Sequence, residues 1–231
     1  MMEALSPANI GLLLFGIFFV LLLIGSPIMV ALGVATMACF IVLDIDLSLM
    51  IERAFASLTA FPLMALPAFV LAGSLMEAAG VSRRLVHVAE NIVGPTPGGL
   101  AISTTLSCVF FGAISGSGVA TASAIGGITI PAMKREGYPA PFAVGVASIS
   151  SILGPIIPPS IVLIVYASIT NVSVAELFLG SVLPGIILAV ALIAYGLYYG
   201  HKHNLPAHEK PNLRKIGASV RKGIWALLMP I

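Results

Sequence analysis

Hydroxyl-bearing residues and glycines gather in one stretch of this sequence, FFGAISGSGVATASAIGG, which covers residues 110–127. It lies inside otherwise apolar sequence, and its hydroxyls belong to Ser115, Ser117, Thr121 and Ser123. Hydroxyl and backbone carbonyl oxygens are ligands that a hard cation such as Na⁺ accepts. The glycines allow backbones to approach closely. The stretch therefore predicts a cation site without a charged ligand.

A second stretch, GPIIPPS at residues 154–160, places helix breakers between two apolar halves. Pro155, Pro158 and Pro159 remove backbone N–H groups, which should leave helical carbonyls free to face an ion. Interrupted backbone at membrane depth persists only where it is buried in protein or lines a cavity. The two interruptions are therefore predicted to form two walls of one site.

Charged residues are absent on both sides of this predicted site. The sequence has no Asp, Glu, Lys or Arg between Glu90 and Lys134, or between Glu136 and Glu176. A proton relay through buried carboxylates is therefore disfavoured, and sodium coupling fits better. The N-termini of broken helices carry partial positive charge, which suits a carboxylate ligand.

Composition places the chain among helical membrane proteins. Hydrophobic residues make up 59% of it and charged residues only 9%, with a mean hydropathy of +1.11, far from the average soluble domain. The net charge of +2 comes from basic loops and indicates orientation, so no nucleic-acid partner is expected. Cys39 and Cys108 lie in apolar runs and are predicted to be packing residues. The first residues include an acid and no Lys or Arg, so no cleavable signal peptide is expected.

The first apolar run, residues 10–43, is too long for one straight span, because such a helix would measure about 51 Å against a hydrocarbon core of about 30 Å. A break at Gly25-Ser26-Pro27 predicts two helices, 10–24 and 28–43, with one kinked, tilted helix as the alternative. An acidic loop is expected at 44–53. The next span, 54–79, should stay continuous through Pro62 and Pro67.

The stretch GVSRRLVHVAENIVGPTPGG, residues 80–99, is predicted to contain a short amphipathic helix in the membrane interface, and an ordinary solvated connector is the alternative. Its polar side carries Arg84, His87, Glu90 and Asn91, and its apolar face is expected to hold Leu85, Val86, Ala89, Ile92 and Val93.

Basic residues flank the apolar run 99–133 on both sides, at Arg83/Arg84 and Lys134/Arg135. A re-entrant hairpin with its tip at 114–118 would keep both flanks in the cytoplasm. Residues 140–170 form the broken helix, 171–176 a short loop and 177–200 another span. The basic segment 201–223 would also be cytoplasmic. The number of crossings is then odd, so an apolar helix starting at Ile224 would begin a second, inverted copy.

Several motifs in this order resemble one family: FPLMALPAFVLAGSLMEAAGVSRRL, GAISGSGVATASAIGGITIPAMKREGY, GPIIPPSIVLIVYA and GIWALLMP. The chain resembles the large membrane subunit, the DctM type, of tripartite ATP-independent periplasmic (TRAP) transporters. Members are nearly twice as long, so the chain looks like the first of two inverted repeats plus the start of the second. Whether it is a fragment or a natural half stays open.

The resemblance implies Na⁺-driven, elevator-type uptake of a small organic acid across the bacterial inner membrane, and no enzymatic activity. A periplasmic substrate-binding protein and a small, DctQ-type membrane subunit would be the partners, and Na⁺ the coupling ion, with no other cofactor. Carried over, the sodium site is framed by Ser115, Gly116, Ser117, Gly154, Pro155, Ile157 and Pro158. The substrate residues are Ser117, Gly118, Thr121, Pro159 and Ser160. Sialic acid carriers have Asp where this chain has Thr121, which leaves the substrate open.

The predicted fold class is thus an all-α integral membrane protein, half of an inverted-repeat transporter, with a re-entrant hairpin and a broken helix. Its parts are 1–53 (scaffold helices), 54–97 (third span and interfacial helix), 98–136 (re-entrant hairpin), 137–170 (broken transmembrane helix), 171–223 (span and basic cytoplasmic segment) and 224–231 (truncated start of the second repeat).

Three alternatives compete with a transport site. The small residues could be only a helix-packing face. A channel could use a re-entrant hairpin as its filter, although the double-proline break has no role there. An intramembrane serine protease would need a base beside ISGSG, and no His lies inside a predicted span.

Overall fold

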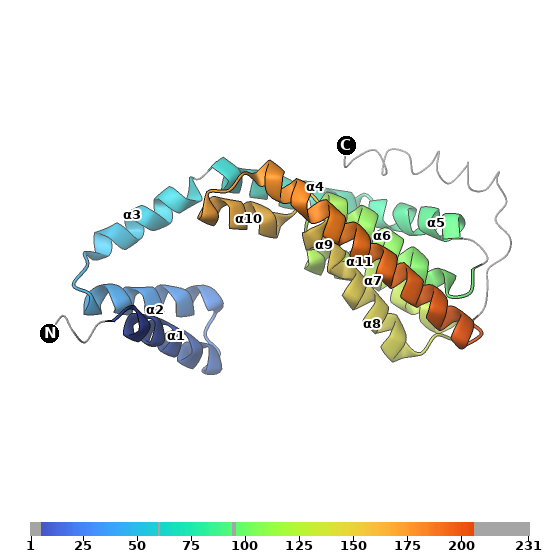
Figure 1. The fold of residues 1–231 in the computed structure, drawn as a ribbon, viewed down its shortest axis with the longest axis horizontal. Helices are drawn as coiled ribbons and strands as arrows, with labels where there is room; N and C mark the ends of the chain where they lie inside the picture. The colour runs from blue at the N-terminus through green and yellow to red at the C-terminus, as the bar shows by residue number, and fades with distance from the viewer. Residues whose placement is uncertain (1–5, 60, 94–95, 206–231) are drawn as a thin grey trace. The chain divides into compact units, whose positions relative to one another are not determined.

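The computed structural model describes residues 6–59, 61–93 and 96–205, and this part of the chain is helical without strands (Figure 1). The chain divides into two compact units, residues 1–60 and 61–231. The first unit contains α1 (Pro7–Leu23), α2 (Ile28–Val42) and α3 (Leu47–Leu58). The described helices of the second are α4 (Phe61–Ala78), α5 (Val81–Val93), α6 (Gly99–Ser115), α7 (Gly118–Arg135), α8 (Ala140–Ser151), α9 (Leu153–Ile156), α10 (Ile161–Thr170) and α11 (Val174–Lys202).

Helices α1 and α2 form a hairpin of two short helices, as predicted, and the single kinked helix is wrong. The turn between them contains Gly25, whose φ of +88° favours glycine. On α2 the buried side chains are Ala31, Ala35 and Cys39. They recur every four residues, so they form one narrow stripe of small side chains. Cys39 is thus a packing residue, as expected.

The predicted acidic loop at 44–53 is wrong, because α3 begins at Leu47. Asp46 caps this helix, and its carboxylate accepts a hydrogen bond of 2.9 Å from the backbone N–H of Ser48. An acidic residue before an apolar one is also a strong N-cap signal, and this signal decides here. The helix in the predicted span 54–79 begins at Phe61 and not at residue 54, and it is continuous through Pro67 as predicted.

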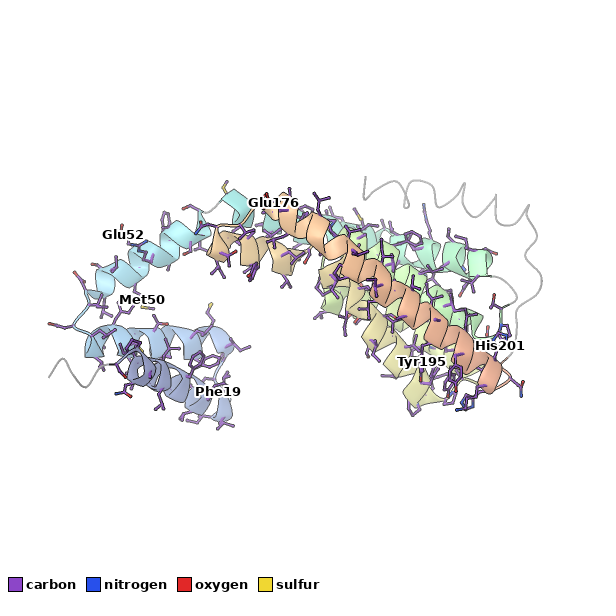
Figure 2. All side chains as sticks on the ribbon, viewed as in Figure 1. Phe19, Met50, Glu52, Glu176, Tyr195 and His201 are labelled. Atoms are coloured by element: carbon purple, nitrogen blue, oxygen red, sulfur yellow. The ribbon has the colours of Figure 1, made fainter. Side chains whose placement is uncertain are left out.

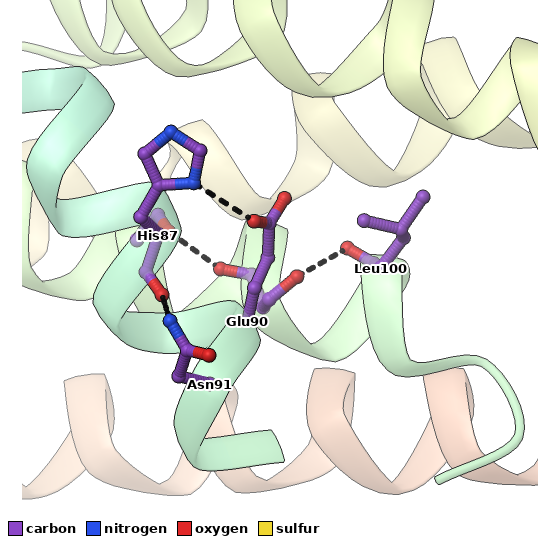
Figure 3. A network of polar contacts seen from close by, with 6 residues as sticks. His87, Glu90, Asn91 and Leu100 are labelled. Atoms are coloured by element: carbon purple, nitrogen blue, oxygen red, sulfur yellow. Dashed lines mark hydrogen bonds and ion pairs between the residues drawn. The ribbon is translucent and has the colours of Figure 1, made fainter. Parts of the chain in front are cut away.

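Helix α5 buries one face against α6 and α7, so the solvated connector is wrong. The side chains of Leu85, Val86 and Ala89 are buried as predicted, together with Val88, which was not expected. Ile92, expected on the apolar face, is 49% exposed. On the polar side, His87 and Glu90 lie 3.2 Å apart, and Asn91 donates to the His87 carbonyl at 2.7 Å (Figure 3). The location of α5 in a membrane interface stays a prediction.

Helices α6 and α7 form a helical hairpin that buries hydroxyl side chains. Ser103, Thr104, Thr105 and Ser107 on α6 are all buried. Their hydroxyls donate to carbonyls three or four residues earlier in the same helix, at 2.6 to 3.1 Å. These bonds satisfy the hydroxyls locally, so small polar residues can occupy the interior, where they let helices approach closely.

The predicted broken helix consists of α8, α9 and α10, and it bends by 42° at the break before Ile161. The following loop is shorter than predicted, because α11 begins at Val174 and includes Glu176 in its first turn. A carboxylate is favoured there by the helix dipole, which explains why the polar loop ends early. Figure 2 shows Glu176 near one end of α11 and His201 near the other.

Helix α11 is long and apolar enough to cross a membrane. Among the described residues the bent α8–α10 pair also qualifies when it counts as one span, and no other helix does. The basic residues after 205 and the predicted start of a second repeat at 224–231 lie outside the described residues.

Candidate functional site

The tip of the α6–α7 hairpin is a two-residue turn at Gly116 and Ser117. Gly116 adopts a left-handed conformation, with φ at +60°, and its N–H donates to the Gly112 carbonyl at 2.8 Å. A Cβ atom placed on Gly116 would lie 2.6 Å from the carbonyl oxygen of Pro159. Both the backbone conformation and the close contact therefore require glycine here.

The hairpin tip lies directly on the break of the α8–α10 helix. The N–H of Ile161 donates to the Gly116 carbonyl at 3.3 Å. One turn earlier on α6, a Cβ atom on Gly112 would lie 2.7 Å from the Cα of Gly154. These contacts confirm the prediction that the two interruptions of the sequence come together.

Three uncharged oxygen atoms gather behind the tip. The hydroxyls of Ser115 and Thr121 lie 3.2 Å apart, and the Thr121 hydroxyl donates to the Ser117 carbonyl at 2.7 Å. The Ser115 hydroxyl is 3.4 Å from the same carbonyl. Ser115 and Thr121 are 4% and 0% exposed. We name this group, two hydroxyls and one carbonyl, the oxygen cluster.

The oxygen cluster also touches the broken helix. A Cβ atom on Gly154 would lie 2.9 Å from both the Ser117 carbonyl oxygen and the Thr121 hydroxyl. Gly118, the first residue of α7, faces Pro155 of the same helix, which a Cβ atom would approach to 3.3 Å. The side chain of Ser123 is exposed and lies outside the cluster.

Two serines act as N-caps at the site. The Ser117 hydroxyl accepts a bond from the Ala120 N–H at 3.3 Å and caps α7. The Ser160 hydroxyl accepts a bond from the Leu163 N–H at 3.3 Å and caps α10. Because the Gly116 carbonyl bonds to Ile161, the positive ends of these two helices meet at the hairpin tip.

The missing N–H group of Pro159 was expected to leave the Pro155 carbonyl, four residues earlier, free, and this expectation is wrong. The buried Ser160 hydroxyl donates to the Pro155 carbonyl at 2.6 Å, so this oxygen has a partner across the break. Gly154 and Pro155 also lie inside the short helix α9, and the interruption begins only at Ile157. Ile157, Pro158 and Pro159 are half-buried within the break itself.

Two further helices complete the surroundings of the site, and sequence patterns did not predict them. A Cβ atom on Gly73 of α4 would lie 3.6 Å from the Cα of Ser115. One on Gly185 of α11 would lie 3.0 Å from the Ile157 side chain. The only signal was glycine inside long apolar helices, which is typical of close helix packing, and α11 has three further glycines besides Gly185.

Fold and site together describe an apolar, all-helical protein in which an interrupted hairpin and an interrupted helix meet through uncharged oxygens. The sequence model of one family, described as "Tripartite ATP-independent periplasmic transporter, DctM component", matches residues 15–231. The chain belongs to this family.

Similar proteins carry related names. The isethionate TRAP transporter permease protein DctMQ of Oleidesulfovibrio alaskensis is 39% identical over 94% of this chain and 35% of its own length. The C4-dicarboxylate TRAP transporter large permease protein DctM of Pseudomonas aeruginosa is 43% identical over 74% of this chain and 40% of its own length. The sialic acid TRAP transporter permease protein SiaT of Haemophilus influenzae is 31% identical over 93% of this chain and 35% of its own length. The chain thus spans about a third to a half of the length of such relatives.

Proposed function

We propose that this chain supplies the first repeat of a TRAP transporter large permease, which takes up a small organic acid with Na⁺ across the bacterial inner membrane. The observation that carries the proposal is the contact of the hairpin tip with the broken helix beside the oxygen cluster. Such a pair of interruptions at membrane depth is typical of secondary transporters.

Sodium is the coupling ion that suits these residues. The cluster offers hydroxyl and carbonyl oxygens, and none of the described residues at the tip or the break carries a charge. Sodium binding is proposed for Ser115, Gly116, Ser117, Gly154, Ile157 and Pro158. An ion there would replace the short hydrogen bonds of the cluster, because hydroxyl oxygens can turn from donors into ligands.

A carboxylate substrate suits the paired helix ends. The N-termini of α7 and α10 meet at the tip, and each contributes partial positive charge. The proposed substrate residues are Ser117, Gly118, Thr121, Pro159 and Ser160. Thr121 is neutral, so it would not repel an acid. The relatives named for isethionate, C4-dicarboxylates and sialic acid support an organic acid and leave its identity open.

The family match supports the proposed partners. A TRAP permease would receive substrate from a periplasmic binding protein and act with a small membrane subunit. The hairpin would be re-entrant, and transport would follow an elevator motion. A protease is disfavoured because the histidines of the described part, His87, His201 and His203, are exposed, and each lies on α5 or at the end of α11.

The re-entrant hairpin predicts that Arg83 and Lys134 face the cytoplasm together. Single cysteines at these two positions, in a background without Cys39 and Cys108, should react alike with a membrane-impermeant thiol reagent in inverted vesicles. Labelling of one position in inverted vesicles and of the other in intact cells would show that the hairpin crosses the membrane.

Transport itself is tested by uptake into proteoliposomes. These contain the full-length protein together with its membrane partner, and the binding protein is added. Uptake of labelled organic acids, tried in turn, should rise with external Na⁺ and stop when choline replaces it. Undiminished uptake in choline would refute sodium coupling but not the permease function. No uptake of any acid under either condition would count against the permease function.

A further inference from the structure

The larger unit has a groove between α6, α8 and α11, and none of the residues that line it belongs to the oxygen cluster. The volume of the groove is about 200 Å³. At its inner wall the hydroxyls of Thr105 and Ser150 bond to each other at 3.0 Å, so they present no unsatisfied group to an occupant. The other lining side chains are mainly apolar, among them Val146, Ile149, Leu192 and Phe142.

Aromatic rings continue the groove toward the C-terminal end of α11. The ring of Phe142, which lines the groove, stacks on Tyr199 with centroids 3.7 Å apart. Tyr195 also lines the groove and is 53% exposed, so its ring stands at the rim (Figure 2). Tyr199 in turn contacts the ring of His203 at 4.2 Å.

A basic residue, Lys202, follows the rings on the same side of α11. Lys202 comes seven residues after Tyr195, which places it on the same helix face about 10 Å further along the axis. Its ammonium group lies 5.6 Å from the ring of Tyr198. The order along this face is therefore apolar groove, aromatic rim and cation. The same order of polarity runs from the interior to the surface of one bilayer leaflet.

We propose that this groove binds a phospholipid with an anionic headgroup. One acyl chain would lie between α8 and α11, Tyr195 would stand at the glycerol level, and Lys202 with His203 would face the phosphate. A helix of a partner protein is the competing occupant, and the test below separates the two. The Lys202 ammonium group at the end of the groove favours an anionic lipid over a neutral one.

Gly145 offers a way to fill the groove without disturbing the fold. It lines the groove on α8, and no atom lies within 4 Å of a Cβ atom placed there. Gly145→Leu should therefore occupy the space of the acyl chain. Gly180→Leu is the matched control, because Gly180 is an exposed helical glycine of α11 with equally open surroundings and lies outside the groove.

The test is native mass spectrometry and thermal unfolding of the purified protein in detergent, with phosphatidylglycerol or phosphatidylcholine added. We expect phosphatidylglycerol to be retained and to raise the melting temperature of the wild type and of Gly180→Leu. Gly145→Leu should lose most of this shift, and Lys202→Gln should reduce it to the level of phosphatidylcholine.

The proposal fails if Gly145→Leu keeps the full shift or if both lipids act alike on the wild type. It also fails if Gly145→Leu binds lipid normally but no longer co-purifies with a membrane partner, because a protein then occupies the groove. Should Gly145→Leu not fold, Lys202→Gln decides alone: an unchanged preference for phosphatidylglycerol overturns the proposal. None of these measurements depends on Na⁺ or on uptake, so they stand apart from the proposed transport function.

Discussion

Two apolar hairpins, α1–α2 and α6–α7, differ in how many side chains they bury and in the kinds of side chain that are buried. Helix α1 has no buried side chain, and α2 buries only Ala31, Ala35 and Cys39. Helix α6, in contrast, is buried along most of its length, and its buried side chains include four hydroxyl residues, Ser103, Thr104, Thr105 and Ser107.

This difference shows that hydrophobicity alone does not indicate the interior of this protein. Large apolar side chains of the first hairpin, such as Leu12 and Met29, are 77% and 80% exposed, as expected where lipid is the solvent. In the second hairpin, small and hydroxyl residues allow backbones to touch. The predictions below compare a change in the second hairpin or the broken helix with a matched change elsewhere.

The largest effect is expected for Gly116→Val. The substitution forces a branched side chain into a positive φ and against the Pro159 carbonyl, which should cost about 3 kcal/mol or more in the free energy of unfolding. Gly33→Val on α2 is the control, because a Cβ atom there meets nothing within 4 Å. It should change stability by about 0.5 kcal/mol or less. Thermal unfolding in detergent measures both, and equal effects would show that the tip contact is unimportant.

The next prediction concerns the break. Changing Pro158 and Pro159 together to Ala should let α9 and α10 join into a continuous helix, because prolines cost about 3 kcal/mol in a helix interior. Backbone carbonyls would then be used within the helix. Sodium bound at the proposed site should raise the melting temperature of the wild type. In the double variant this rise should be absent, while membrane insertion stays normal.

Pro67→Ala in α4 provides the comparison, since α4 is already continuous through this proline. This variant should keep the sodium-dependent rise. A double variant that also keeps it would show that the break is only a packing kink.

A smaller effect is expected for Thr121→Val, which removes a hydroxyl of the oxygen cluster at nearly constant shape. Thr121 is buried and bonds to Ser117 and Ser115, so stability should fall by about 1 to 2 kcal/mol. Thr36→Val on α2 removes a hydroxyl that bonds only to the Leu32 carbonyl of its own helix, and should cost about 0.5 kcal/mol or less. Sodium affinity should fall in Thr121→Val alone. A similar sodium affinity in both variants would exclude Thr121 as a ligand.

The smallest effect concerns Asp46, the cap of α3 in the first unit. Hydrogen bonds from the backbone and side chain of Ser48 hold the pKa of its carboxyl below the usual value. The cap therefore stabilises α3 above the pKa of the unfolded chain, about 3.9, and this contribution is lost as the pH falls through the lower, folded pKa.

Asp46→Asn keeps a capping oxygen that does not titrate, whereas Asp46→Ala removes it. Proteolysis between residues 44 and 59 should be faster in Asp46→Ala than in the wild type at neutral pH, and this difference should shrink in acid. On acidification, proteolysis should increase more in the wild type than in Asp46→Asn. Identical pH profiles of the wild type and Asp46→Asn would show that the cap does not contribute.

Local sequence signals predicted the breaks of this fold. Gly25-Ser26-Pro27 separates α1 from α2, and residues 116–117 and 157–160 interrupt the later helices near the expected places. Glycine and proline act through φ and the missing N–H group, which are properties of the chain itself. A different kind of signal failed at Asp46. A charged residue after an apolar run indicates a loop and a helix cap equally well.

By itself, then, the sequence determined that the chain is apolar and helical, where its helices are interrupted, and that uncharged oxygens lie near the interruptions. The tertiary structure alone decided how those oxygens are used. Ser160 bonds to the Pro155 carbonyl across the bend between α9 and α10. Gly112, far away in the sequence, meets Gly154 only because α6 packs against α9. Contacts between residues far apart depend on how helices pack, and neither residue type nor spacing encodes that arrangement locally.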